Sequence, residues 1–152
     1  MRIAAISLLV LLGACSKEAP MPLDIAQSKM MIWEVIKSYH DSVDKHQIEI
    51  VQTLLTPDVS LVLSNDMDVI RGQDPVLGAI RSKMKSNWDP ETRSTITGKE
   101  VIRPDGNTAV VTYVASVGQQ RGIITVICSR INNKWLIHHI HDTWSMEKAP
   151  KK

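Results

Sequence analysis

Residues 108–117 read TAVVTYVASV, a run rich in β-branched side chains. Side chains alternate across a strand, which places Ala109, Val111 and Tyr113 on one face and Val110 and Val114 on the other. The turn sequence PDGN precedes this run, and GQQRG and NNK interrupt the strand-like sequence after it. We therefore expect an antiparallel meander, with strands at residues 93–103, 108–117, 122–131 and 135–144.

Helical spacing of apolar residues dominates the chain before the meander. It predicts a long helix over 25–45, a second over 47–55 and a third that begins at Asp74 and Pro75 and runs to about Ser86. Two short strands, VSLVLS and DVIRG, are expected around the turn Asn65-Asp66 between the second and third helices. Helices first and a sheet of about six strands later is an α+β pattern.

The strands of the meander are apolar on both faces, and GIITVIC at residues 122–128 shows this most clearly. A small antiparallel sheet that is covered on one side should alternate apolar and polar side chains more cleanly. Three helices are too few to cover both faces of six strands. We therefore expect a homodimer formed through the sheet.

The first fourteen residues have the features of a secretory signal: one cation at Arg2, a mostly apolar run over 3–12, and small residues before Cys15. The sequence Leu12-Gly13-Ala14-Cys15 resembles the lipobox of bacterial lipoproteins. The resemblance implies a signal peptide over 1–14 and acylation of Cys15 with fatty acids such as palmitate. With Ser16 following the cysteine, the expected location is the outer membrane, facing the periplasm. A plain secreted protein is the alternative.

The expected mature chain contains a lipidated tether at 15–23, one domain at 24–146 and a polar tail at 147–152. The formal net charge of the whole chain is only +2, and it has no basic or aromatic stripe. This composition argues against nucleic acid as a partner. With Cys15 used by lipid, Cys128 has no disulfide partner within the chain, and its apolar neighbours predict that it is buried.

The order of these elements resembles the nuclear transport factor 2-like superfamily, in its SnoaL-like branch. The resemblance rests on four stretches in addition to the long first helix: LLTPDVSLV, RGQDPVLGAI, PDGNTAVVTY and NNKWLIHHIHDT. The last of these is similar to a Trp-x-x-x-His-x-His-x-Ser/Thr ending, here Trp135, His139, His141 and Thr143. The resemblance implies a cone-shaped, curved antiparallel sheet wrapped around the first helix, with a pocket at its open end. It implies no single activity, because the superfamily contains both enzymes and binding proteins.

The stretch WLIHHIHDTW at residues 135–144 contains three of the five histidines. Strict alternation places His139, His141 and Thr143 on one face and His138 on the other. The resemblance places the first face inside the cone. Together with Tyr39 and Tyr113, these side chains form the expected ligand pocket, and His139, His141 and Tyr39 are the candidate catalytic groups.

Three interpretations of the histidine pair remain open. Two imidazoles could contribute to a metal site, but a catalytic zinc needs a third protein ligand, and no second motif supplies one; we expect no metal and no cofactor. Histidines whose pKa lies near neutral pH could exchange protons with a carbonyl or hydroxyl substrate. They could also be structural. We therefore expect a lipid-anchored envelope protein that binds a small, largely apolar molecule, with a cofactor-independent isomerase, dehydratase or hydrolase as the alternative.

Overall fold

The computed structural model describes residues 24–64, 68–86, 94–96 and 101–146. It contains three helices in this part of the chain: α1 at Ile25–Asp44, α2 at Ile48–Leu54 and α3 at Gln73–Ser86. Asp24 caps α1, because its side chain accepts a hydrogen bond of 3.2 Å from the amide of Ala26. The predicted bounds of all three helices agree with these within two residues.

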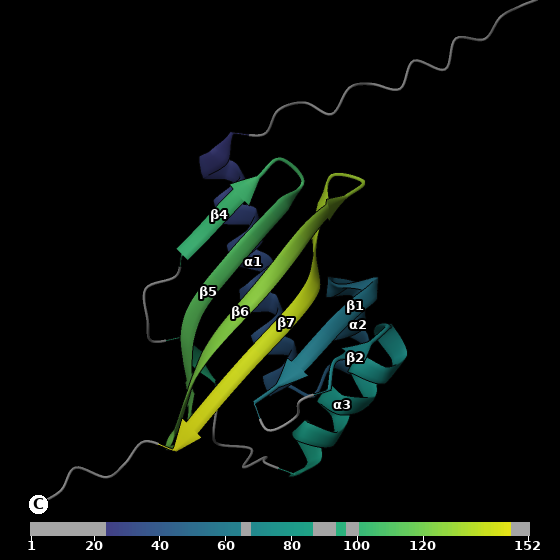
Figure 1. The fold of residues 1–152 in the computed structure, drawn as a ribbon, viewed down its shortest axis with the longest axis vertical. Helices are drawn as coiled ribbons and strands as arrows, with labels where there is room; N and C mark the ends of the chain where they lie inside the picture. Colours follow the sequence, from purple (N-terminus) through teal and green to yellow (C-terminus); the bar gives the residue numbers. More distant parts are fainter. Residues whose placement is uncertain (1–23, 65–67, 87–93, 97–100, 147–152) are drawn as a thin grey trace, which may run out of the picture.

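The strands form one sheet in the order β2-β1-β7-β6-β5-β3, with β4 also paired to β5 (Figure 1). They span Leu55–Leu63 (β1), Ile70–Arg71 (β2), Thr95–Ile96 (β3), Val101–Asp105 (β4), Thr108–Val117 (β5), Gln120–Ile131 (β6) and Lys134–Met146 (β7). The β4 to β7 meander is antiparallel, as the turn sequences predicted. However, β1 runs parallel to β7. The expectation of a wholly antiparallel sheet was therefore wrong, and the sheet is mixed.

The turn between β6 and β7 fixes the register of the two longest strands. Asn132 and Asn133 both have positive φ angles, 50° and 63°, as a two-residue hairpin turn requires. Asparagine tolerates this conformation better than other residues with a β-carbon. The pairing of Ile131 with Lys134 closes the hairpin around these two residues.

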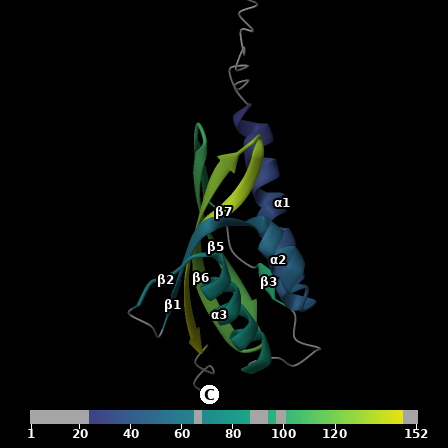
Figure 2. The same ribbon diagram turned by 90° about the vertical axis from the view of Figure 1, so that its right-hand side faces the viewer.

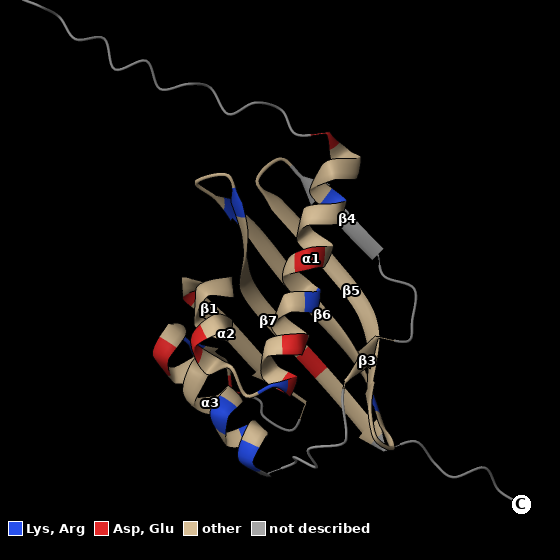
Figure 3. Ribbon diagram, turned by 180° about the vertical axis from the view of Figure 1, so that it is seen from behind, with Lys and Arg blue, Asp and Glu red and all other residues tan. Residues whose placement is uncertain are grey.

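All three helices lie on one face of the curved sheet, which does not close into a barrel (Figures 2 and 3). Ile32 and Ile36 of α1 are fully buried, as are Val111 of β5 and Val126 and Cys128 of β6. Burial also raises the pKa of the Cys128 thiol to about 12, so the thiol is inert at neutral pH. The α+β class, the long first helix and the curved sheet are as predicted, and the core lies between α1 and the inner face.

The other face of the sheet carries none of the described helices and is the face seen in Figure 1. Val110, at 41% exposure, and Ile123, at 57%, lie on it. The predicted lipobox and signal segment fall outside the described residues. Within the described part of the chain, no helix is both long enough and apolar enough to cross a membrane.

Candidate functional site

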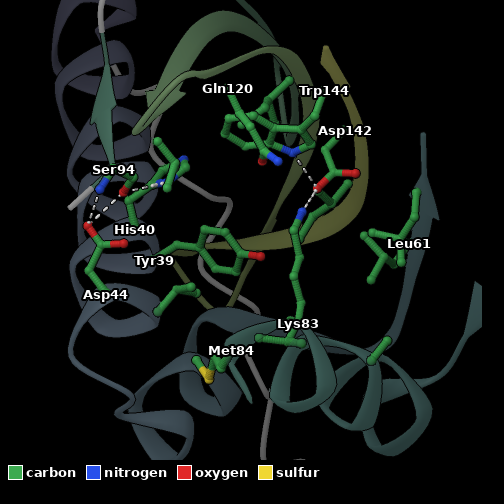
Figure 4. Close-up of a pocket in the computed structure, with 17 residues that line it drawn as sticks. Tyr39, His40, Asp44, Leu61, Lys83, Met84, Ser94, Gln120, Asp142 and Trp144 are labelled. Atoms are coloured by element: carbon green, nitrogen blue, oxygen red, sulfur yellow. Dashed lines mark hydrogen bonds and ion pairs between the residues drawn. The ribbon is translucent and has the colours of Figure 1, made fainter. Parts of the chain in front are cut away.

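A cavity of about 100 Å³ opens at the end of the domain where α1 terminates (Figure 4). Its walls come from the C-terminal half of α1, from α3, and from the inner faces of β1, β6 and β7. Most of the lining is apolar: Val43, Leu61, Leu63, Ala79, Ile80, Met84, Val117, Ile124, Ile140 and Trp144. The polar lining residues form two groups, and Tyr39 and Gln120 lie outside both of them.

The first polar group is an ion pair held against an indole ring. The ammonium of Lys83 on α3 lies 2.6 Å from Oδ2 of Asp142 on β7, and it also lies 5.2 Å from the ring centroid of Trp144. The indole Nε1 of Trp144 donates a second hydrogen bond, of 3.1 Å, to the same oxygen. The other carboxylate oxygen, Oδ1, is buried and has no hydrogen-bond partner among the described residues. Asp142 is thus a buried carboxylate whose position is set by two donors from different elements.

Trp144 can take this position because residue 122 of the neighbouring strand is glycine. A β-carbon at Gly122 would lie 2.7 Å from Cδ2 of Trp144 and 2.8 Å from the carbonyl oxygen of Thr143. Such contacts are too short for any real side chain. The glycine in β6 therefore allows the indole to lie against the sheet and to reach Asp142.

Tyr39 projects from α1 into the middle of the cavity (Figure 4). Among the residues that the structure describes, its hydroxyl has no hydrogen-bond partner. Loss of hydration in the cavity wall, followed by the negative charge of Asp142, raises the pKa of Tyr39 well above its ordinary value. The phenol therefore stays protonated and can donate a hydrogen bond into the cavity.

The second polar group is a chain of hydrogen bonds at the opposite wall. His40 Nε2 lies 2.7 Å from the hydroxyl of Tyr113, and His40 Nδ1 lies 3.4 Å from Oγ of Ser94. Ser94 Oγ donates a hydrogen bond of 2.7 Å to Oδ2 of Asp44, so it can only accept from His40. This assigns the proton of His40 to Nδ1 and makes Tyr113 the donor to Nε2.

His40 is neutral at physiological pH. Loss of hydration in the cavity wall lowers the pKa of His40 to about 4, and this effect exceeds the opposing attraction of Asp44. Burial likewise raises the pKa of Tyr113. The hydrogen-bonded chain thus joins uncharged groups to one carboxylate, and it leaves no spare donor facing the cavity.

The structure brings together only part of the predicted site. Tyr39 lines the cavity, whereas Tyr113 lies behind the wall, where it is 1% exposed and bound to His40. The prediction that His139, His141 and Thr143 face the cavity is wrong. The inward-facing residues of β7 are Trp135, Ile137, Ile140, Asp142 and Trp144.

The physical reason is a bulge in β7. Cys128 of β6 pairs with Ile137, but the adjacent Ile127 pairs with His139, so His138 is an extra residue in the ladder. Beyond the bulge the alternation is inverted, and Ile140 and Asp142 point inward. His139, His141 and Thr143, which were expected on the helix-covered face, therefore lie on the uncovered face.

The outer histidines form a cluster of their own. His139 Nδ1 lies 2.8 Å from Oγ of Ser60 on β1. His138 lies 3.4 Å from both Thr56 and Asp58. Partial burial and, next, the proximity of His141 lower the pKa of His139. No described group of three or more ligating side chains could hold a metal ion.

Sequence reasoning missed Lys83 and Asp142, and it did not place His40 in the pocket. One signal was present: Asp142 is the single carboxylate in β7. Strict alternation nevertheless assigned it to the outer face.

Comparison with known families gives one match that covers most of the domain. A family model described as a SnoaL-like domain matches residues 32–146. A search among curated proteins gives no match.

Many solved structures share the fold. An NTF2-like superfamily protein from Salmonella enterica serovar Typhimurium has a TM-score of 0.68 at 20% identity, covering 84% of this chain and 96% of its own. A Nostoc punctiforme protein with a cystatin-like fold reaches 0.70 at 15% identity, with coverages of 79% and 92%. A candidate dehydratase of the NTF2-like family from Streptomyces avermitilis reaches 0.65 at 16% identity, with coverages of 77% and 95%. At these identities the likeness establishes the fold.

Proposed function

The chain belongs to the SnoaL-like domain family, and we propose that its cavity binds a small, largely apolar molecule that carries a carbonyl or carboxylate oxygen. The observation that supports this proposal most directly is the hydroxyl of Tyr39, a protonated donor without a partner among the described residues, inside a cavity whose lining is mostly apolar. The family fold suggests a domain for small-molecule binding or acid–base catalysis. The proposed ligand class follows from the side chains that line the cavity.

The size of the cavity restricts the ligand. An engineered protein cavity of about 150 Å³ accommodates benzene, and this cavity is about 100 Å³. A ligand of the size of one ring or a short chain therefore fits better than a multi-ring compound. The apolar walls provide the affinity, because each buried methylene contributes ~0.8 kcal/mol.

The polar groups of the cavity restrict the chemistry of the ligand. Tyr39 offers an O–H donor, and the Lys83 ammonium lies in the same lining, beside the Asp142 carboxylate. An acceptor oxygen on the ligand is complementary to these two donors. A buried donor that lacks an acceptor costs about 1–3 kcal/mol, so an apolar ligand without such an oxygen should bind more weakly.

This proposal predicts that cyclohexanone or benzoate binds more tightly than cyclohexane or benzene. Tyr39→Phe should weaken binding of the oxygen-bearing probes by roughly tenfold, in line with the ~1–1.5 kcal/mol of one lost hydrogen bond. It should strengthen binding of benzene, because the benzene complex no longer contains a buried hydroxyl without an acceptor. Ligand-observed NMR titration measures both. His139→Gln, on the outer face, is the matched control and should bind every probe as the native protein does.

Equal affinity of Tyr39→Phe and native protein for all probes would show that the Tyr39 hydroxyl does not contact the ligand.

The same spectra test the alternative, an acid–base enzyme in which the Asp142 carboxylate accepts a proton beside the Tyr39 donor. Exchange of the α-protons of cyclohexanone with D2O, lost in Asp142→Asn, would favour the enzyme over the binding protein.

The proposal includes the location of the domain. The lipobox-like sequence before Cys15 supports a bacterial lipoprotein, anchored by acylated Cys15 in the outer membrane and facing the periplasm. More than one acyl chain is sufficient for stable attachment. The folded domain then acts as a tethered binding protein in that compartment.

A homodimer through the uncovered face of the sheet is also part of the proposal. Cross-strand pairs Val110–Ile127 and Val114–Ile123 flank the hydrogen-bonded pair Thr112–Thr125 on this face. The chain without residues 1–15 should sediment as a dimer at micromolar concentration. Ile123→Asp should convert it to a monomer, because an unpaired charge is costly in an apolar interface.

Ile50→Asp is the control, because Ile50 is similarly exposed, at 45%, but lies on α2. Its sedimentation should remain that of the dimer. A native chain that sediments as a monomer would contradict the proposed interface.

A further inference from the structure

The N-terminal end of α1 and the turn between β6 and β7 lie at the same end of the domain (Figures 1 and 3). Ile25, at 64% exposure, and Met30, at 61%, are the most exposed large apolar side chains in the described part of the chain, and both lie in the first two turns of α1. Ile131, at the β6–β7 turn, is 41% exposed. Three apolar side chains are thus exposed to water at one end of the molecule.

Cations accompany these apolar side chains. Lys29 follows Ile25 by one helical turn, and Arg130 and Lys134 flank the β6–β7 turn. Asp24, the carboxylate at the start of α1, caps the helix and keeps its negative charge, so it offsets one of these three cations. We call the surface formed by Ile25, Lys29, Met30, Arg130, Ile131 and Lys134 the tether-end surface.

The chain length before α1 relates this surface to a membrane. Eight residues, Ser16 to Leu23, separate Cys15 from Asp24. A fully extended chain of this length spans at most ~28 Å. The α1 helix itself is about 30 Å long, at 1.5 Å for each of its 20 residues. An anchored Cys15 therefore keeps the start of α1 within ~28 Å of the bilayer, about the length of α1 itself.

We propose that the tether-end surface docks onto anionic lipid headgroups, with Ile25, Met30 and Ile131 in the interfacial layer. This inference rests on the lipid anchor included in the proposed function. Apolar side chains beside lysine and arginine are the combination that an anionic membrane surface binds. The cavity lies at the opposite end of α1, so the docked domain presents its pocket to the aqueous compartment.

The test uses the full-length protein, acylated in its host, purified and reconstituted into liposomes. One set of liposomes contains phosphatidylcholine with phosphatidylglycerol, and the other contains phosphatidylcholine alone. An amine-reactive acetylating reagent and mass spectrometry give the labelling rate of each lysine. Lys29 and Lys134 should be labelled severalfold more slowly in anionic liposomes, whereas Lys45 and Lys85, at the far ends of α1 and α3, should keep their rates.

The double variant Ile25→Ser, Met30→Ser should lose most of this protection. The control Ile50→Ser, Val69→Ser removes two other exposed apolar side chains and should keep it. Raising the salt concentration should also weaken the protection, because headgroup attraction is screened.

If the acylated protein shows the same labelling rate for each of the four lysines in both kinds of liposome, the proposed docking is wrong, although the lipid anchor is present. An intact mass without acyl groups on Cys15 would overturn the anchor and the docking together. Protection in native envelopes but not in anionic liposomes would indicate a protein partner. It would likewise contradict the proposal that lipid headgroups bind the tether-end surface. None of these outcomes bears on ligand binding in the cavity.

Discussion

Replacing Gly122 by alanine should destabilise the domain by about 1–2 kcal/mol, the size of cost typical of an overpacked core site. The added methyl group would lie 2.7 Å from the indole of Trp144 and 2.8 Å from the backbone carbonyl of Thr143. The carbonyl belongs to the paired strand β7 and cannot rotate away, so the indole and the strand must both move. Chemical denaturation measures the free energy of unfolding.

The same substitution should weaken ligand binding. Displacing the indole removes the 3.1 Å hydrogen bond from Trp144 Nε1 to Asp142 and the contact between the ring and Lys83. The carboxylate then loses one of its two donors and turns within the cavity. Affinity for the oxygen-bearing probes should fall together with stability.

Gly78→Ala is the matched control. Gly78 lies within α3, is exposed, and has no atom within 4 Å of the position of an added β-carbon. Alanine has a higher helix propensity, so this variant should be more stable by ~0.5–1 kcal/mol. If both glycine variants shift stability in the same direction, steric contact with Trp144 does not explain the effect at Gly122.

Most of the meander was predictable because local signals determine it. The strand expected at 93–103 was not: the structure has β3 at Thr95–Ile96 and β4 at Val101–Asp105, so Pro104 and Asp105 of the expected turn belong to a strand. PDGN and NNK supply asparagine and glycine at the turns, and the predicted strand over 108–117 coincides with β5. Helix bounds followed from caps and apolar spacing in the same way. These features depend on residues that are neighbours in the sequence, which is the range over which pattern reasoning is reliable.

The faces of β7 were not predictable from alternation. The bulge at His138 depends on how β7 pairs with β6, and the shift in pairing of β1 with β7 between Leu55 and Ser60 depends on contacts about 80 residues apart in sequence. A single extra residue moves every later side chain to the other face. The candidate site therefore moved from the histidines to Ile140, Asp142 and Trp144.

The polar groups of the cavity were missed for a related reason. Lys83 and Asp142 are 59 residues apart, and His40 and Tyr113 are 73 apart. Neither pair has a sequence spacing that marks it. Tyr39 was found because its helical position follows directly from the apolar stripe of α1.

Acidification should destabilise the domain through His40. The pKa of this histidine is about 4 in the folded protein, against an ordinary value of 6.5. The unfolded chain therefore binds a proton that the folded protein excludes, and stability is full above pH 6.5 and falls as the pH drops from 6.5 toward 4. A shift of this size corresponds to a loss of ~2 kcal/mol between pH 7 and pH 5.

His40→Gln should reduce this loss, because glutamine does not titrate. Its amide oxygen can still accept a hydrogen bond from Tyr113, so the variant tests the charge more than the contact. The measurement is the free energy of unfolding by urea at pH 7 and pH 5.

An equal loss of stability between pH 7 and pH 5 in native protein and His40→Gln would show that His40 is protonated without cost in the folded state. The assigned chain from Tyr113 through His40 and Ser94 to Asp44 would then be incorrect, because a neutral His40 is what allows Nε2 to accept from Tyr113.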